Sequence, residues 1–267
     1  MRRHAALSAG LLSTGALLLC AGCSTATTTG GAAEPATDQA PVVKAAVAAT
    51  SKGPARMDQK IEISDGGVNA AITVTGDVDF AAHKASLAVD FPQGGISHLD
   101  EVLAGKQAYV RGASSGLDDD TWVVVPRDTA VAHYVLRAPL NDPEHVLRQI
   151  SAMRRVTEAG SEKVAGVPTT RYRGMLDHET LTLRMDPETR KKVDQARDLV
   201  GGDLPAYGEA WVDQQGRVVR TRMSMDLGGA HVTVTTGLSA LGKPTRVTVP
   251  SDDGAVPGSG VTGILTG

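Results

Sequence analysis

Aromatic side chains are scarce in this sequence, since Phe, Trp and Tyr make up only 3% of its 267 residues. Any large apolar face must therefore be built from Val, Ala, Leu and Met, which are small or flexible side chains. Such a face can pack against another one as an ordinary aliphatic core, or it can leave room for a flexible apolar ligand. Composition alone favours the ordinary core.

Cysteine is nearly absent as well. The only two cysteines are Cys20 and Cys23, so the chain has no disulfide framework, and a domain of this length does not need one. Their C-x-x-C spacing is that of a thioredoxin-type redox pair. A redox pair needs a folded domain around it to lower a thiol pKa, and the residues upstream of Cys20 are too few to build one. A redox centre is therefore a poor interpretation.

The position of the two cysteines favours a different role. Two arginines near the start are followed by residues 5–19, which carry no Asp, Glu, Lys or Arg, as in a secretory signal peptide. This run is too short to span a membrane comfortably. Ala21 and Gly22 precede Cys23 in a pattern that resembles the bacterial lipobox, with Cys20 standing where an aliphatic residue is usual. A plain cleaved signal and an uncleaved anchor are the alternatives.

We therefore predict that residues 1–22 are a lipoprotein signal peptide and that Cys23 is lipidated. Two acyl chains on Cys23 would hold the protein at the extracytoplasmic face of the cell membrane without a transmembrane helix. Residues 23–40 contain no large apolar side chain and are expected to be a flexible tether. Residues 41–249 are predicted to form one domain, and residues 250–267 a flexible tail.

An excess of basic residues is missing too. The formal net charge is −3, which argues against a nucleic-acid partner. Catalytic motifs are also missing: Gly237–Leu241 lacks the second glycine of a nucleophile elbow, and Thr182 stands where a zincin-type motif starting at His178 needs its second histidine. Asp118–Asp120 lacks the spaced ligands of a calcium loop. We predict no enzymatic activity, no metal and no cofactor.

The folded region contains a repeated alternation of apolar and polar residues, which is typical of strands with one buried face. Alternation, rather than continuous apolar runs, favours antiparallel strands. Strands are predicted within residues 67–80, 83–91, 107–112, 121–126, 163–177, 206–213, 216–227 and 231–238.

Three segments have helical features instead. Pro41 opens an apolar stretch over residues 41–51, while Asp142-Pro143 and Asp186-Pro187 each combine a capping carboxylate with a proline suited to the first turn. The flank of the last helix is expected to consist of Val193, Ala196, Leu199 and Val200. The fold class predicted is α+β, with a single curved antiparallel sheet and helices packed on its concave apolar face.

Several stretches resemble one known family. They are "AAVAATSK", "TVTGDVDF", "QAYVRG" followed by "TWVVVP", "AGVPTTRYRG" and "GEAWVDQQGRVVR", in this order along residues 41–249. With the lipobox cysteine, they make the sequence similar to the LppX/LprAFG-type lipid-binding lipoproteins of actinobacteria, which share a half-barrel fold with the LolA and LolB lipoprotein-handling proteins. The motifs are of moderate specificity, and none is a catalytic signature.

The resemblance implies a cavity between the concave sheet and the helices that holds the acyl chains of a lipid or glycolipid. It also implies that the protein carries such molecules through the cell envelope as a monomer, with a membrane transporter as a further partner. The candidate lining residues are Ile72, Val74, Val78, Leu87, Val89, Val146, Ile150, Met153, Met175, Met223 and Met225. The alternative is an extracytoplasmic interaction or sensing module with a filled core and no lipid cargo.

Arginines near a cavity mouth could meet a phosphate or sugar head group, because guanidinium groups bind phosphate in bidentate fashion. The candidates are Arg154, Arg155, Arg171 and Arg173. The alternative for each of them is an ordinary solvated strand face.

Overall fold

The computed structural model describes residues 37–92, 97–112 and 120–258. The signal peptide, Cys23, most of the tether and Asp118–Asp119 therefore lie outside the described residues. The elements are α1 (Ala40–Thr50), β1 (Pro54–Asp65), β2 (Val68–Asp79), β3 (Lys84–Asp90), β4 (His98–Ala104), β5 (Gln107–Arg111), β6 (Trp122–Pro126), η1 (Pro139–Asn141), α2 (Pro143–Ser151), β7 (Arg154–Val164), β8 (Val167–Met175), α3 (His178–Leu181), α4 (Pro187–Val200), β9 (Ala206–Asp213), β10 (Val218–Leu227), β11 (Ala230–Ser239), η2 (Asp252–Gly254) and β12 (Ala255–Pro257).

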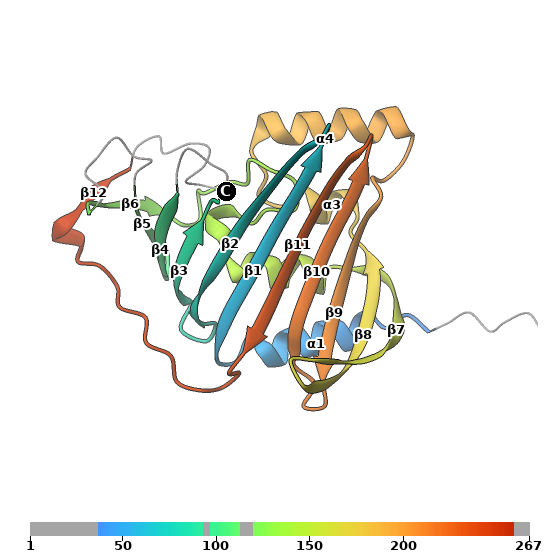
Figure 1. Ribbon diagram of the computed structural model, residues 1–267, viewed down its shortest axis with the longest axis horizontal. Helices are drawn as coiled ribbons and strands as arrows, with labels where there is room; N and C mark the ends of the chain where they lie inside the picture. The colour runs from blue at the N-terminus through green and yellow to red at the C-terminus, as the bar shows by residue number, and fades with distance from the viewer. Residues whose placement is uncertain (1–36, 93–96, 113–119, 259–267) are drawn as a thin grey trace, which may run out of the picture. The chain divides into compact units, whose positions relative to one another are not determined.

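All strands belong to one sheet, in the order β12-β6-β5-β4-β3-β2-β1-β11-β10-β9-β8-β7. Every neighbouring pair is antiparallel except β12 and β6, which run parallel. The first and last strands of this order do not pair with each other, so the sheet stays open (Figure 1). This confirms the predicted fold class of a single unclosed antiparallel sheet with helices.

The core lies on the inner face of this sheet, the face that carries the helices. Val74 pairs with Val89 across β2 and β3, and Met223 pairs with Val234 across β10 and β11. Paired residues point to the same side, and all four belong to one buried cluster. The polar residues between them point to the outer face, as the alternation in the sequence predicts.

Helices α2 and α4 begin where the sequence predicts. The carboxylate of Asp142 accepts a hydrogen bond from the backbone N–H of Glu144 at 2.9 Å, and that of Asp186 accepts from Glu188 at 3.1 Å and from Thr189 at 2.9 Å. Proline occupies the first turn of both helices. Each carboxylate satisfies backbone donors that the helix cannot satisfy by itself.

Helices α1 and α2 pack against each other and against the β9–β10 part of the sheet, whereas α4 crosses the upper ends of the long central strands (Figure 1). The apolar flank expected for α4 is only partly correct. Val193 is buried and Ala196 is partly buried, but Leu199 is 88% exposed and Val200 is 51% exposed, because the last turn of the helix extends into solvent. No helix among the described residues is long and apolar enough to cross a membrane.

The C-terminal segment differs from the loose tail that its composition suggests. Residues 255–257 form β12, which pairs with β6, and the hydroxyl of Tyr109 donates to the carboxylate of Asp252. The physical reason is that β6 would otherwise end the sheet with unpaired backbone groups, which β12 satisfies. Backbone pairing of this kind leaves no mark on side-chain composition.

Candidate functional site

The candidate lining residues lie almost entirely in one place, the inner face of the sheet and the side of α2 that packs on it. The members of the buried cluster are Val74, Val78, Leu87, Val89, Val146, Ile150, Met153, Met223 and Met225. Ile72 is partly buried at the edge of the same cluster, while Met175 is half-buried outside it. The sequence therefore identifies residues that share one face, and in this structure they pack against each other.

The hollows formed by the described residues lie mostly elsewhere. A groove of about 520 Å³ lies on the outer face, lined by Val164, Val219 and Leu241 among others. A second groove, of about 480 Å³, runs beside α2 and is lined by Met153, Lys44 and Arg148 among others. Met153, in the second groove, is the one candidate lining residue that borders either of them. The inner face is thus covered by its own side chains and by the helices.

A carboxylate lies on the inner face among these apolar side chains. Glu101 of β4 is 1% exposed and lies between Leu99 and Leu103 on the same side of the strand. In the sheet it stands opposite Leu87 on β3 and Val110 on β5. Burial raises the pKa of Glu101 to about 7, since the ionised form is poorly solvated there.

Two residues of the segment that leads to α2 accompany Glu101. The side-chain amide of Asn141 donates to both carboxylate oxygens of Glu101, each at 3.0 Å. The Nε of Arg137 donates in turn to Asn141 Oδ1 at 3.3 Å. Leu136, Leu140 and Asn141 all have positive φ values, so the segment turns sharply around this cluster. We call Glu101, Arg137 and Asn141 the inner polar cluster.

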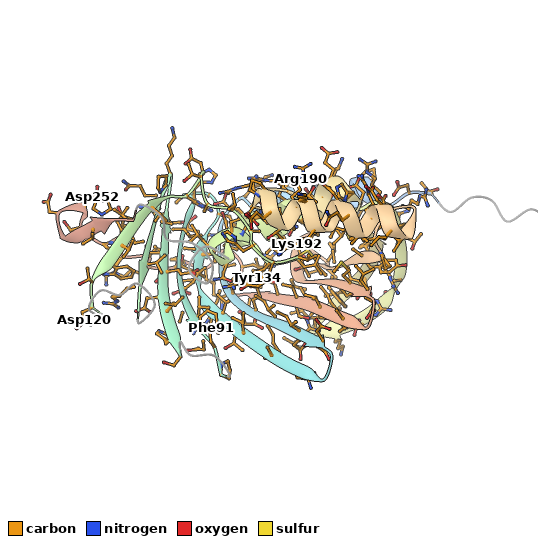
Figure 2. The ribbon with its side chains drawn as sticks, turned by 90° about the horizontal axis from the view of Figure 1, so that it is seen from above. Phe91, Asp120, Tyr134, Arg190, Lys192 and Asp252 are labelled. Atoms are coloured by element: carbon orange, nitrogen blue, oxygen red, sulfur yellow. The ribbon has the colours of Figure 1, made fainter. Side chains whose placement is uncertain are left out.

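Arg137 is 4% exposed, and its Nη2 has no hydrogen-bond partner among the described residues. Its guanidinium carbon lies 5.8 Å from the ring centre of Phe91 and 5.8 Å from that of Tyr134. In the view from above, these two rings lie near each other between strands β3–β6 and helix α4 (Figure 2). Tyr134 is 45% exposed, so the cluster is close to solvent at this ring.

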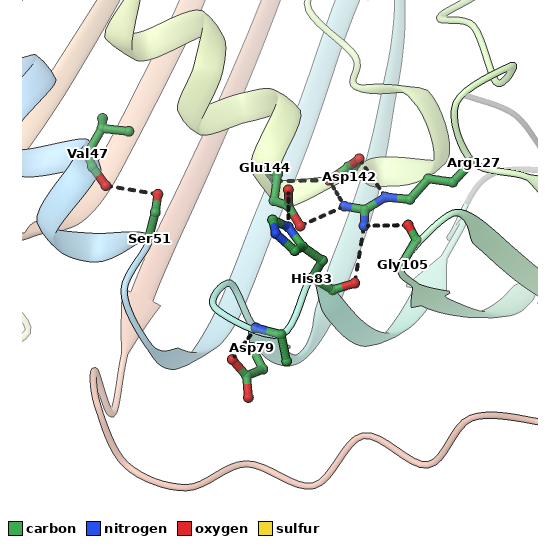
Figure 3. Close-up of polar contacts among 9 residues, drawn as sticks. Val47, Ser51, Asp79, His83, Gly105, Arg127, Asp142 and Glu144 are labelled. Atoms are coloured by element: carbon green, nitrogen blue, oxygen red, sulfur yellow. Dashed lines mark hydrogen bonds and ion pairs between the residues drawn. The ribbon is translucent and has the colours of Figure 1, made fainter.

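A second buried arginine fixes the start of α2. Arg127 donates to both oxygens of Asp142, at 3.0 and 2.8 Å, and to Glu144 at 3.0 Å. Its Nη1 also donates to the backbone oxygens of His83 and Gly105, which flank β3 and β4 (Figure 3). All its nitrogens are therefore used, and the arrangement ties the N-terminus of α2 to the sheet.

Helix α2 also buries polar side chains without partners. His145 is 1% exposed, and neither ring nitrogen has a hydrogen-bond partner among the described residues. Burial lowers the pKa of His145 to about 4, so the ring is neutral at physiological pH. No three His, Cys, Asp or Glu side chains in the described part of the chain are placed to hold a metal ion.

The arginines considered for a head group lie on β7 and β8, at the far edge of the sheet from Glu101. Arg154 pairs with Asp177 at 2.6 Å, and Arg171 donates to the backbone oxygen of Ala159 at 3.0 Å. Arg173 stacks over the ring of Tyr207 at 4.6 Å. Arg155 is exposed and has a φ of 52°. Three of the four are thus engaged with their neighbours, as on an ordinary strand face.

Sequence reasoning missed the inner polar cluster. One signal was available, since Leu99, Glu101 and Leu103 are two positions apart and would share one face of a strand, which places an acidic residue in an apolar row. Arg137 and Asn141 gave no signal, because an arginine and an asparagine between predicted elements are typical of a surface loop.

The fold is similar to those of known lipoproteins. The crystal structure of LprF from Mycobacterium bovis matches with a TM-score of 0.50 and 14% identity, covering 81% of this chain and 99% of that one. Lipoprotein LppX from Mycobacterium tuberculosis matches with a TM-score of 0.47 and 14% identity, covering 78% and 97%. No protein-family model and no curated protein matches the sequence. The chain therefore has an LprF-like half-barrel fold.

Proposed function

We propose that this protein is an extracytoplasmic lipoprotein of the LppX/LprAFG type, anchored through Cys23, that binds the acyl chains of a lipid or glycolipid and carries it through the cell envelope. The candidate lining residues named above are its proposed acyl-chain contacts. The observation that carries the proposal is the inner face of the open sheet, which presents mainly aliphatic side chains from strands in both halves of the sheet and few polar ones, such as Glu101 and Gln59.

Such a surface suits acyl chains for a physical reason. Each methylene group that leaves water for an apolar surface contributes about 0.8 kcal/mol, and this gain needs no directional partner. Methionine side chains such as Met223 and Met225 adapt to ligands of variable shape. Because the inner face is covered in this structure, an acyl chain would enter as α1 and α2 separate from the sheet, exchanging protein contacts for lipid contacts of similar strength. No fuel is required for that exchange.

Native mass spectrometry of the full-length protein purified from its own host tests the proposal. A carrier is expected to show adducts of lipid mass that disappear when the same sample is denatured, whereas the covalent anchor on Cys23 persists. A bare polypeptide in every native preparation would contradict lipid carriage.

A second candidate function is an interaction or sensing module without cargo. It is favoured by the packing itself, since the candidate lining residues fill the space between sheet and helices with each other. In that case, the outer groove lined by Val164, Val219 and Leu241 is a surface for an envelope protein. A bare polypeptide in the same mass spectra is the outcome expected for this module.

The anchor has its own test. A Cys23→Ala variant expressed in the host is expected to leave the membrane fraction, because one thiol carries the whole lipid attachment. Cys20→Ala serves as the matched control, since Cys20 lies in the predicted signal peptide and is removed with it. Equal membrane retention of wild type and Cys23→Ala would contradict the anchor assignment.

A further inference from the structure

The inner polar cluster is an unusual feature for a surface proposed to bind only acyl chains. Glu101 shares the inner face with Leu87, Leu99 and Leu103, and it is 1% exposed. The only hydrogen-bond donor that reaches its carboxylate among the described residues is Asn141. A buried polar group without full partners costs free energy, so a cluster of this kind needs a reason other than packing.

Arg137 supplies the second observation. It is 4% exposed and its buried Nη2 has no acceptor among the described residues, although a guanidinium is a strong donor. No ion pair joins Arg137 directly to Glu101, and Asn141 stands between them. Arg137 therefore keeps a free donor at the inner face, beside a carboxyl group that is already held.

The aromatic rings beside Arg137 suggest how a ligand could reach its guanidinium group. Phe91 is half-buried and Tyr134 is 45% exposed, and both rings lie 5.8 Å from the guanidinium carbon. Because Tyr134 is 45% exposed and its ring covers the guanidinium, rotation of Tyr134 about its side-chain bonds would bring Arg137 closer to solvent. Exposed side chains rotate within nanoseconds.

We propose that the inner polar cluster is a binding site for a single anionic group, a carboxylate or a phosphate, at the end of an acyl chain that lies on the inner face. Arg137 Nη2 donates to the anion, while Asn141, which donates to Glu101 and accepts from Arg137 Nε, holds the cluster in place. The inference rests on the proposed function and adds to it the chemical class of the head group and its place.

An anion fits this site better than a neutral hydroxyl does. The free donor is charged, and hydrogen bonds between a guanidinium and an anionic oxygen are about twice as strong as neutral ones. The charged groups that face Glu101 are Arg137 and Asp142, with Asn141 as the hydrogen-bond donor. Because Asp142 is already neutralised by Arg127 at 2.8 Å, Arg137 is the cation available to the ligand.

The test compares ligands that differ only in the head group. Oleic acid is paired with oleyl alcohol, and oleoyl lysophosphatidic acid with monoolein, and each displaces the uncharged fluorescent ligand 1-aminoanthracene from the full-length protein. The wild type is expected to bind each acid about tenfold more tightly than its neutral partner. A preference for the carboxylate or for the phosphate tells which anion the site accepts.

Single-residue variants test whether Arg137 causes the preference for acids over neutral lipids. Arg137→Gln is expected to remove the preference for the acids and leave oleyl alcohol binding unchanged. Arg220→Gln is the matched control, because Arg220 also lies 5.8 Å from an aromatic ring, that of Trp211, but on the outer face. It is expected to keep the full preference. At pH 8, Glu101→Gln is expected to bind oleate several-fold more tightly, because a neighbouring ionised carboxylate is removed.

The outcomes separate the two proposals. Equal binding of acids and neutral lipids by the wild type overturns the anion site and leaves acyl-chain binding standing. The same holds if Arg137→Gln keeps the preference. Binding of none of the probes overturns both proposals. If Arg137→Gln does not fold, the comparison of acids with neutral lipids on the wild type still decides.

Discussion

The protonation of Glu101 gives the most direct check on the structure of the inner face. Replacing Glu101 by Gln keeps the size of the side chain and an oxygen that can accept from Asn141, but it removes the ability to ionise. The wild-type carboxyl group is 1% exposed among aliphatic side chains. One of the two hydrogen bonds from Asn141 is lost at every pH, so the pH dependence of the difference between variant and wild type isolates the free energy of burying one negative charge.

The magnitude follows from the pKa of Glu101, which burial raises from 4.5 to about 7. Between these two pH values the folded protein binds a proton that the unfolded chain has lost, so the free energy of unfolding decreases as pH rises through this range. The contribution is fully present below pH 4.5 and is lost above about pH 7. One proton over this range corresponds to about 3 kcal/mol.

Glu101→Gln is therefore expected to gain about 3 kcal/mol in unfolding free energy relative to wild type between pH 4.5 and pH 8. Urea denaturation at several pH values, followed by the fluorescence of Trp122 and Trp211, measures the difference. The matched control is Asp100→Asn, the adjacent residue on the outer side of the same strand, where it pairs with Arg111 at 2.7 Å. A constant difference between wild type and Glu101→Gln across this pH range would refute the burial of an ionisable Glu101.

Other parts of the molecule give further expected outcomes. Arg127→Met should lower the free energy of unfolding, measured by urea denaturation, by about 3 to 5 kcal/mol, since it leaves Asp142 as a buried charge without its cation. A loss below 1 kcal/mol would contradict the role of Arg127 in holding Asp142. Gly76→Ala should lower the free energy of unfolding by about 2 kcal/mol or more, because the new Cβ would stand 2.0 Å from a backbone oxygen of the next strand. Its control, Gly53→Ala, has its nearest contact at 3.9 Å and should lower it by less than 1 kcal/mol. Equal losses for the two variants would contradict the close approach at Gly76. His145→Phe should gain about 3 kcal/mol in free energy of unfolding relative to wild type as pH falls from 6.5 to 4. The reason is that the buried wild-type ring, with its pKa lowered to about 4, stays neutral in the folded state while the unfolded chain binds a proton. A pH-independent difference between the two proteins would contradict the burial of His145.

The parts of the fold that local sequence encodes could be predicted. The carboxylate caps of α2 and α4 depend on residues within three positions of each other, and strand alternation depends on neighbours two positions apart. Strand β1 was missed, because Gln59 interrupts its apolar row. Gln59 is nevertheless buried, and its amide donates to Thr236 Oγ1 on β11 at 2.9 Å. Its partner is 177 residues away, so the hydrogen bond that allows Gln59 to be buried cannot be predicted from the residues around it.

The candidate site likewise contains residues that local sequence predicts and residues that depend on distant parts of the chain. Apolar residues such as Val74, Val89 and Met223 could be assigned to one face from alternation alone, and they do share one cluster. The inner polar cluster depends on the approach of a loop to a strand, with Asn141 lying 40 residues from Glu101. Glutamate and arginine are rarely fully buried, so sequence reasoning places them at the surface by default.

The two buried titrating groups have opposite effects on the stability of the wild type. Between about pH 4.5 and 6.5, the neutral ring of His145 makes the protein more stable as pH rises, while Glu101 makes it less stable. Each effect involves one proton, about 1.4 kcal/mol per pH unit, so their sum is close to zero. The unfolding free energy of the wild type is thus expected to be nearly flat in this range. Each single variant should reveal the slope of the other group, rising with pH for Glu101→Gln and falling for His145→Phe. A wild-type slope equal to that of either variant would show that one of the two groups is not buried in the form described.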